Sequence, residues 1–374
     1  MTKPMPLAQF TRLPPALHVE ALAGLSGAID LVAARAPESH RFLRYGWYDA
    51  AIRTYGGTAR TLIVQCEGAP VIALPIAAMG APWTGWARVP GSYWPFRSFP
   101  AAADAGLAAF DALLGQLARE AVVLRLGPIY DDDPVLHPMR RAAQAAGWTV
   151  IDRFVADSYR LDMAAAAAQD GGWPRASTRK KNRFHEKHLA THGAIEWSFV
   201  TGAEWSAARF DALAEIERQS WIATRTDGRD AKFTLDGHGG FWRAVADDPV
   251  IADMLWAAVL TIDGRPTAFS FDLNTGALKY AIANSYDPVV GKHSPGKLLY
   301  YRNLIRAMAD GIKMVDWGAG DSGYKRTIGA VPGPAIRDWL FVRPGAAASL
   351  ARLLAGWWAR SGNSRHGTAA EAEN

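Results

Sequence analysis

The sequence is poor in residues that cross-link a fold or bind metal in a recognisable pattern. Its single cysteine, Cys66, excludes an intrachain disulfide framework. Because it ends the apolar run TLIVQC, we interpret it as a buried strand residue and not as a covalent relay. His185, His188 and His192 are spaced three and four residues apart, but they lie among lysines and arginines. We therefore predict a basic surface there and no metal site.

Long hydrophobic runs are also absent. No uninterrupted apolar stretch is long enough to cross a bilayer, so we predict no transmembrane helix. The N-terminal residues MTKPMPLAQFTRLPPALHVEAL lack the apolar core of a secretory signal. Together with the single cysteine, these features predict a cytoplasmic protein.

The composition is that of a folded protein with a basic surface. Of its 374 residues, 49% are hydrophobic and 21% are charged, and a chain of this length is typical of two domains. Fifteen tryptophans are many for this length. A net charge of +5 and a pI near 9.3 favour contact with anions such as phosphates, acidic carrier proteins or an anionic lipid surface.

The positive charge is concentrated in one segment. Residues 175–192, RASTRKKNRFHEKHLATH, contain six Lys or Arg and one Glu, and this local excess of five equals that of the whole chain. The segment is either a solvated helix face or a patch that binds phosphate or an acidic carrier protein through Lys180, Lys181 and Arg183. It has no helix-turn-helix, zinc-finger or RNA-recognition signature, so we predict no DNA binding.

Two hairpin-like stretches indicate an internal duplication. Residues 60–78 read as strand, turn and strand around Glu67-Gly68, and residues 254–274 do so around Asp263-Gly264. Each hairpin leads to an apolar-periodic helix and then a strand, at residues 108–121 and 122–127 in the first copy and 297–311 and 312–318 in the second. Two strands, a crossover helix and a further strand form a mixed sheet, so we predict two α/β domains of one design.

Only the second copy has a phosphate-binding pattern between its hairpin and its helix. Residues 286–301 read YDPVVGKHSPGKLLYY, and Ser294 is predicted to cap the helix before Pro295. A pyrophosphate would then meet the positive end of the helix dipole and the charge of His293. It would accept hydrogen bonds from the amides of Gly296, Lys297 and Leu298. The alternative is an ordinary capped helix after a flexible turn.

A strand, a phosphate-binding turn, a helix and a further strand resemble the coenzyme A site of GNAT-superfamily acyltransferases. The chain is similar to the branch with two tandem GNAT-like domains, the FemAB/CelD-like acyltransferases. The resemblance is carried by STRKKNRFHEKHLATHG, IERQSWIATRTDGRDAKF, LKYAIANSYD, HSPGKLL and VDWGAGDSGYKRTIG, which lie within residues 177–329. The usual turn of the superfamily is Gln/Arg-x-x-Gly-x-Gly/Ala, and HSPGK stands in its place here.

The resemblance implies an α/β fold of two tandem GNAT-like domains, each a mixed sheet flanked by helices. The implied divisions are a degenerate domain at residues 1–155, an acyltransferase domain with the acyl-CoA site at 156–345, and an amphipathic helix with a disordered tail at 346–374. The implied co-substrate is acyl-CoA or an acyl carrier protein thioester, with no permanently bound cofactor.

The implied chemistry is transfer of an acyl group from a thioester to a primary amine. An alkyl ammonium with a pKa of about 10 must first lose a proton, and the candidate bases are Asp316, Asp272 and Glu217. Tyr324 is the candidate proton donor to the departing thiolate, with Lys325 beside it as an anion partner.

Further contacts are implied for the donor and the acceptor. The developing oxyanion is expected near Asn284 and Tyr286, at the splayed end of a strand. Trp221 and Arg225, in the second of the resembling segments, are expected to contact the substrate or an anion.

The sequence favours an apolar acceptor. Residues 346–362 place leucines and tryptophans at helical spacing beside arginines, which is typical of a terminal helix packed on the body or of an interfacial helix. With the Trp-rich residues 83–100, this favours a long-chain lipid amine, such as the sphingoid base that ceramide synthases of this branch acylate. A peripheral position on the inner face of the cytoplasmic membrane would follow.

Other interpretations remain open. A Fem-like aminoacyl transfer to a cell-wall precursor would use aminoacyl-tRNA, and the basic segment would then contact RNA. The acceptor could instead be an amino sugar on the way to a polysaccharide. From a different class, the chain could be a non-catalytic scaffold for envelope synthesis.

Overall fold

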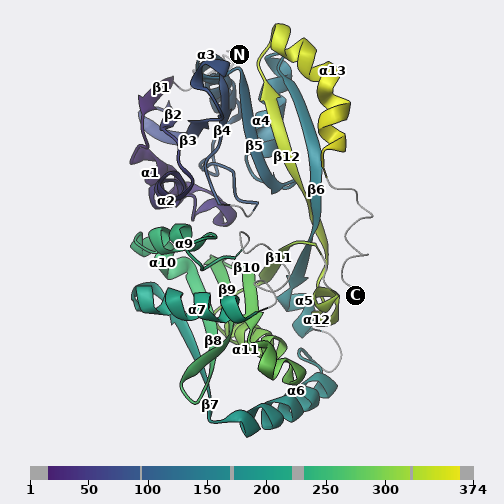
Figure 1. Ribbon diagram of the computed structural model, residues 1–374. Helices are drawn as coiled ribbons and strands as arrows, with labels where there is room; N and C mark the ends of the chain where they lie inside the picture. Colours follow the sequence, from purple (N-terminus) through teal and green to yellow (C-terminus); the bar gives the residue numbers. More distant parts are fainter. Residues whose placement is uncertain (1–15, 93–94, 169–171, 221–230, 321–322, 363–374) are drawn as a thin grey trace, which may run out of the picture.

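The computed structural model describes residues 16–92, 95–168, 172–220, 231–320 and 323–362 (Figure 1). Its strands are β1 (Leu17–Ala23), β2 (Ala59–Cys66), β3 (Ala69–Ala78), β4 (Trp86–Arg88), β5 (Val123–Tyr130), β6 (Thr149–Asp162), β7 (Ile195–Thr201), β8 (Leu255–Ile262), β9 (Arg265–Thr275), β10 (Leu278–Tyr286), β11 (Met314–Ala319) and β12 (Val331–Val342).

Helices follow the strands on both faces of the sheet. They are α1 (Ala28–Arg35), α2 (Tyr45–Tyr55), α3 (Leu107–Glu120), α4 (Leu136–Ala145), α5 (Met163–Ala167), α6 (Ala176–Leu189), α7 (Ala207–Gln219), α9 (Gly239–Val245), α10 (Pro249–Met254), α11 (Pro295–Ala309), α12 (Tyr324–Ile328) and α13 (Ala346–Arg360). Short 3-10 turns are η1 (Glu38–His40), η2 (Pro82–Thr84), η3 (Ala190–His192), η4 (Gly202–Glu204) and η5 (Pro288–His293).

In the described residues, the twelve strands form one sheet with an internal two-fold pattern. The strand order is β1-β2-β3-β4-β5-β12-β6-β11-β10-β9-β8-β7. Counted inward from either edge, three antiparallel pairs are followed by one parallel pair and one antiparallel pair. We name β1–β5 with β12 the N-terminal unit, and β7–β11 with β6 the C-terminal unit.

The two units exchange their last strands. β6 follows the N-terminal unit in the chain but pairs with β11, whereas β12 follows the C-terminal unit but pairs with β5. β6 and β12 also pair with each other, and Figure 1 shows them side by side from the N-terminal unit at the top to the C-terminal unit below. The predicted division at residues 155/156 falls inside β6 and stays a prediction about the repeats.

The predicted duplication is visible in the elements themselves. Hairpins β2–β3 and β8–β9 turn where expected, and both central residues of each turn have positive φ, at Glu67 and Gly68 (51° and 81°) and at Asp263 and Gly264 (49° and 77°). Positive φ at both positions gives the twist that suits a two-residue hairpin. The expected helices and strands correspond to α3, β5, α11 and β11.

The sheet of the C-terminal unit is covered by helices on both faces, and each face has its own hydrophobic cluster. On one face, α11 packs Leu298 and Leu299 against β8 and β9. On the other face, the largest core cluster continues from the N-terminal unit into the C-terminal unit, where Trp47 of α2 meets Phe241 of α9 at 4.9 Å between ring centroids. The two units therefore share a core on one face of the sheet.

The last helix shows only part of its apolar side to the sheet. α13 lies along β6 and β12, where Trp358 packs under the guanidinium of Arg153 at 4.1 Å. The other large apolar side chains of α13 are exposed, and these are Leu350, Leu353, Leu354 and Trp357. The predicted tail beyond residue 362 lies outside the described residues. No described helix is both long and apolar enough to cross a membrane.

Candidate functional site

The parallel strands β10 and β11 separate after three paired residues and form a fork. The last pair is Tyr280 with Asp316, and the register of β10 against β9 shifts between Ala281 and Ala283. From there to Tyr286, the described pairing of β10 is with β9 alone. Because alternate residues of a strand direct their amides and carbonyls to opposite sides, this part of β10 offers backbone groups to an extended ligand.

The turn after β10 leads directly into the N-terminus of α11. Ser294 occupies the capping position with φ of 53°, but its side chain makes no capping hydrogen bond. The amide of Leu298 donates to Ser294 O at 3.0 Å, so it is not available to a phosphate as predicted, and the Leu298 side chain is buried. Among the described residues, the amides of Gly296 and Lys297 have no backbone acceptor outside the helix.

Gly296 is required by close packing of this turn on β10. A Cβ atom built there would lie 2.6 Å from Asn284 Oδ1 and 3.0 Å from Tyr286 Cδ1. Asn284 Nδ2 donates to Gly296 O at 3.3 Å. The predicted oxyanion and phosphate residues are thus brought together, with β10 touching the first turn of α11.

The basic segment folds as α6 and lies against this turn, which the sequence did not reveal. An ion pair between Glu186 and Arg302 ties α6 to α11, and His192 Nε2 lies 3.1 Å from His293 Nε2. The side chains gathered here form what we call the basic cluster, which consists of Lys181, His185, His188, His192, Lys292, His293 and Lys297.

Positively charged neighbours contribute to a lowered pKa at three members of the basic cluster. Burial, Lys181 and Lys297 lower the pKa of His185, and burial, His192 and Lys292 lower that of His293. Burial and Lys181 also lower the pKa of Lys297. An anion placed at the start of α11 would reverse these shifts, because opposite charge favours the protonated form of each group.

The other residues predicted to contact a substrate or an anion lie in different places. Lys180, Lys181 and Arg183 all lie on α6, and all three are exposed. Within the described residues, only Lys181 of the three is a neighbour of the turn. Trp221 and Arg225 lie outside the described residues.

Asp316 is the predicted carboxylate that lies at the fork. It is 1% exposed and accepts hydrogen bonds from Tyr130 Oη at 3.0 Å, Arg160 Nε at 2.8 Å and Gly318 N at 2.8 Å. Burial raises its pKa, and the ion pair with Arg160 opposes that rise. Neither Tyr130 nor Arg160 was predicted, because their strands join β11 only through the exchange of β6.

The other two predicted carboxylates have structural partners. Asp272 accepts from Lys279 Nζ at 3.0 Å and from Asn303 Nδ2 at 2.6 Å, and all three side chains are buried. Glu217 accepts from the amides of Lys232 at 3.0 Å and Phe233 at 2.7 Å. Burial raises the pKa of Glu217. Asp272 lies on β9 and Glu217 on α7, so neither belongs to the last pair of β10 and β11, and neither is placed as the proton acceptor at the fork.

The two predicted residues of α12 have different surroundings. Tyr324 is 38% exposed, stacks on Tyr300 with centroids 5.6 Å apart, and has its hydroxyl 3.5 Å from the Tyr300 hydroxyl. Lys325 is buried, and Nζ donates to the carbonyls of Trp317, Ala319 and Gly320 at 2.9, 2.9 and 2.5 Å. Its three protons are thereby used, which contradicts the predicted role as an anion partner.

A cavity of about 280 Å³ lies between the two units, on the face of the sheet opposite α11. Its wall includes Tyr280 of the fork and the two side chains that donate to Asp316, which are Tyr130 and Arg160. Its ionisable lining residues carry both signs of charge and are Glu38, His40, Asp132, Asp133, Arg160 and Lys313. The cavity therefore suits a polar, charged ligand that reaches toward the fork.

One wall of the cavity is fixed by a buried polar triangle. His40 Nε2 lies 3.1 Å from Ser98 Oγ and 3.2 Å from Asp133 Oδ2, and Ser98 Oγ donates to Asp133 Oδ1 at 3.1 Å. The run DDD before Pro134 was the sequence signal for this turn, but its partners lie 35 to 93 residues away. No group of three or more metal-binding side chains occurs among the residues that the structure describes.

Comparison with known protein families gives a match within the C-terminal unit. Residues 176–326 match the family described as "Acetyltransferase (GNAT) domain". No curated protein sequence gave a significant match. This segment is therefore similar to GNAT acetyltransferase domains, and it includes the fork, the basic cluster and Tyr324.

Solved structures extend the likeness to most of the chain. FemX superposes with a TM-score of 0.59 at 10% identity, covering 90% of this chain and 100% of that chain. The C-terminal domain (DUF2156) of a putative lysylphosphatidylglycerol synthetase from Agrobacterium fabrum gives 0.54 at 14% identity, covering 87% and 93%. A conserved protein of unknown function from Bacteroides thetaiotaomicron gives 0.54 at 12%, covering 86% and 98%. At these identities the likeness concerns the fold, a mixed α/β sheet with GNAT-like units.

Proposed function

We propose that the protein transfers an acyl group from an activated donor to a primary amine. The observation that carries this proposal is the position of the fork. It opens between the basic cluster, which suits a phosphate-bearing donor, and the charged cavity on the opposite face of the sheet. Asp316 lies where the two meet.

In this proposal the donor lies along β10. Its phosphates contact the amides of Gly296 and Lys297 and the basic cluster, at the positive end of the α11 dipole. Its acyl carbonyl lies near the free side of β10 at residues 284–286, where backbone amides can stabilise the oxyanion. GNAT domains generally use acyl-CoA as co-substrate, and no permanently bound cofactor is needed for this chemistry.

The acceptor amine enters from the cavity and loses its proton at the fork. We assign Asp316 as the proton acceptor, because it is the buried carboxylate at the last pair of β10 and β11. Arg160 and Tyr130 hold it in place. A positioned base contributes about 10²–10⁴-fold to such a reaction. Tyr324, on the α11 side of β11, is assigned as proton donor to the departing group.

An aminoacyl donor is supported at least as well as acyl-CoA. FemX and the lysylphosphatidylglycerol synthetase domain share the fold, and the exposed basic side of α6, with Lys180 and Arg183, suits the backbone of a tRNA. A Fem-like transfer to a cell-wall precursor would also use the charged cavity for a polar acceptor. An amino sugar fits the same description.

The lipid acceptor has narrower support. The exposed apolar side of α13 and the exposed Trp83 suit contact with a membrane surface. The lining of the cavity is mixed, with apolar side chains such as Phe42, Phe96 and Leu278 beside the charged ones, so it does not distinguish a polar acceptor from a sphingoid base.

The test compares donor classes in one format. Purified protein is mixed with acetyl-CoA, a long-chain acyl-CoA, an acylated carrier protein or a pool of aminoacyl-tRNAs. Each donor is paired with a sphingoid base, an amino sugar or a diamine, and the products are identified by mass spectrometry. Thiol release with a new amide supports the thioester donor, and amide formation only from the tRNA pool supports the aminoacyl donor.

Two variants tie the activity to the fork. Tyr324→Phe is expected to lower kcat with little change in KM for the donor. Asp104→Asn serves as the control, because Asp104 is an exposed carboxylate that forms an ion pair with Arg35 at the end of α1. Absence of transfer from every donor by folded protein would overturn the proposal and favour the scaffold.

A further inference from the structure

The N-terminal unit contains a second fork, and its charges are the opposite of those at the first. β4 and β5 run parallel for three residues, and their last pair is Arg88 with Arg125. The equivalent pair in the C-terminal unit is Tyr280 with Asp316. Where the C-terminal fork has a buried carboxylate, the N-terminal fork therefore has a guanidinium group.

A third arginine joins this fork from the loop after β4. Arg97 is partly buried, and among the described residues its one side-chain hydrogen bond runs from Nε to Ser92 O at 3.0 Å. Arg88 Nε is fully buried and has no acceptor in the part of the chain that the structure describes. Within the same residues, neither Arg88 nor Arg97 makes an ion pair.

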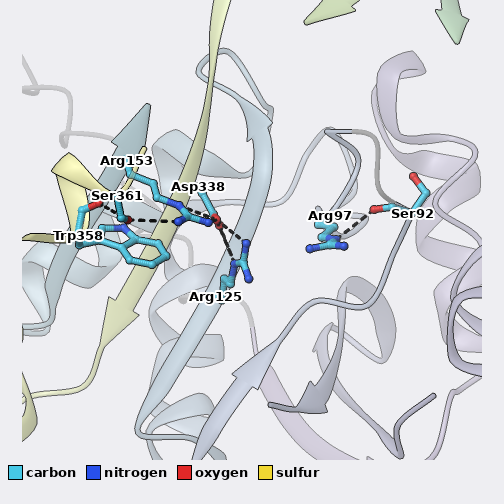
Figure 2. A network of polar contacts seen from close by, with 7 residues as sticks. All are labelled: Ser92, Arg97, Arg125, Arg153, Asp338, Trp358 and Ser361. Carbon is cyan, nitrogen blue, oxygen red and sulfur yellow. Dashed lines mark hydrogen bonds and ion pairs between the residues drawn. The ribbon is translucent and has the colours of Figure 1, made fainter. Parts of the chain in front are cut away.

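The buried carboxylate of Asp338, which contacts this fork, already accepts hydrogen bonds from other arginines. Asp338, which is fully buried, accepts from Arg125 Nε at 2.9 Å and from Arg153 Nη2 at 2.9 Å. Figure 2 shows Arg125 and Arg153 converging on Asp338, with Arg153 between this carboxylate and Trp358, while Arg97 faces them from its loop. Asp338 thus pairs directly with two arginines, and although its charge partly opposes the lowering of the Arg97 pKa, neither Arg88 nor Arg97 has an ion-pair partner among the described residues.

Arg88 and Arg97 both line a small cavity. It measures about 20 Å³ and is lined by Tyr55 and Gly56 of the α2 end, by Arg88 to Gly91 and by Arg97. A volume of about 10–15 Å³ is enough for one water molecule, so there is room for a single small group. Tyr55 brings no negative charge, because burial raises the pKa of its phenol and its hydroxyl lies 2.9 Å from His238 Nδ1.

Uncompensated guanidinium groups in such a place are costly. Charged groups removed from water are normally paired or bind an ion. Burial, with Arg125 and Arg88 as further causes, lowers the pKa of Arg97 to about 10. The group is still protonated at neutral pH, so its charge persists and calls for a partner.

We propose that this cavity binds a small anion between Arg88 and Arg97, either a chloride ion or the oxygen end of a carboxylate or phosphate. The anion neutralises the N-terminal fork and fixes the loop that carries Arg97. The neighbours of Arg97 in that loop, Phe96 and Ser98, line the large cavity between the units. The anion site therefore supports one wall of that cavity from behind.

The binding test uses the full chain and does not depend on catalysis. Broadening of the ³⁵Cl NMR line is measured for the wild type, Arg97→Gln and Arg88→Gln, with Arg141→Gln, an exposed arginine, as matched control. The two cavity variants are expected to lose a distinct part of the broadening that the wild type and Arg141→Gln retain. Competition with acetate or phosphate then identifies which anion binds best. Equal broadening in all four proteins would overturn the proposal.

A stability measurement guards against variants that fold poorly. Without small anions, Arg97→Gln is expected to melt at or above the wild-type temperature, because it removes an unpaired charge. As chloride or phosphate is added, the wild type should gain a few degrees with saturation and overtake the variant, as ligand linkage requires. Arg97→Lys, which keeps the charge, should follow the wild type. Parallel anion dependence in the wild type and Arg97→Gln would refute the site.

Discussion

Replacing Gly296 by alanine tests the contact between β10 and the first turn of α11. The added Cβ would lie 2.6 Å from Asn284 Oδ1 and 3.0 Å from Tyr286 Cδ1, which is inside normal contact distance for both. Overpacking of this kind costs about 1–3 kcal/mol. Alanine in place of glycine in a helix returns up to about 1 kcal/mol. We therefore expect a net loss of roughly 0.5–2 kcal/mol in the free energy of unfolding.

The displaced atoms define the functional effect of this change. The clash pushes Asn284 and the end of β10 away from the proposed phosphate site, so KM for the donor should rise while kcat changes less. Urea denaturation and initial-rate kinetics measure the two effects separately. Removing the first obstacle, in the double variant with Asn284→Ala, should recover part of the stability and show coupling between the two positions.

Gly115→Ala is the matched control for this prediction. Gly115 also lies in a helix, α3, but a Cβ built there meets nothing within 4 Å. This variant should be stabilised by up to about 1 kcal/mol. If Gly296→Ala were as stable as Gly115→Ala and had an unchanged KM, the close packing of the turn would carry no consequence and the phosphate-site assignment would fail with it.

Four further changes test the site. Asp316→Asn should lower kcat by roughly 10²–10⁴-fold, read from initial rates against Asp104→Asn. Since the pKa values of His185 and His293 are lowered in the free protein and a bound anion would raise them, donor affinity should increase as pH falls below the ordinary histidine pKa; binding titrations at several pH values should show this slope, and Gln at both positions should flatten it. Lys181→Gln should weaken donor binding in a salt-dependent way, and an effect that is independent of salt would argue against it. Lys325→Met should cost about 1–3 kcal/mol in urea denaturation, because three carbonyls lose their donor.

Local chemistry made the elements predictable. The Glu-Gly and Asp-Gly pairs fixed the two hairpins, because these residues tolerate the positive φ that both turns use. Apolar periodicity located α3, α11 and α13 to within two residues at their ends. The repeat of these elements gave two α/β domains of one design, the resemblance of residues 177–329 implied the GNAT-like layout, and the match at residues 176–326 supports it for the second copy.

Contacts between distant residues were not predictable. The basic segment and the turn at residue 293 were each identified, but their meeting depends on contacts such as Arg302 with Glu186, 116 residues apart. Asp316 was chosen for its strand, whereas its partner Arg160 lies 156 residues away. Lys325 was misassigned because its sequence neighbours do not show that the end of β11 curls around its ammonium group.

The exchange of β6 and β12 links completion of the N-terminal unit to the synthesis of residues 331–342. The N-terminal unit lacks its last strand until residues 331–342 have left the ribosome, and until then β5 is an open edge. Open edges of this kind pair readily with other chains. A gene fragment cut between the repeats would therefore not encode a working half, and the protein should resist division into separately expressed parts. Because β12 pairs with β5 on one side and β6 on the other, it covers an open edge of each unit.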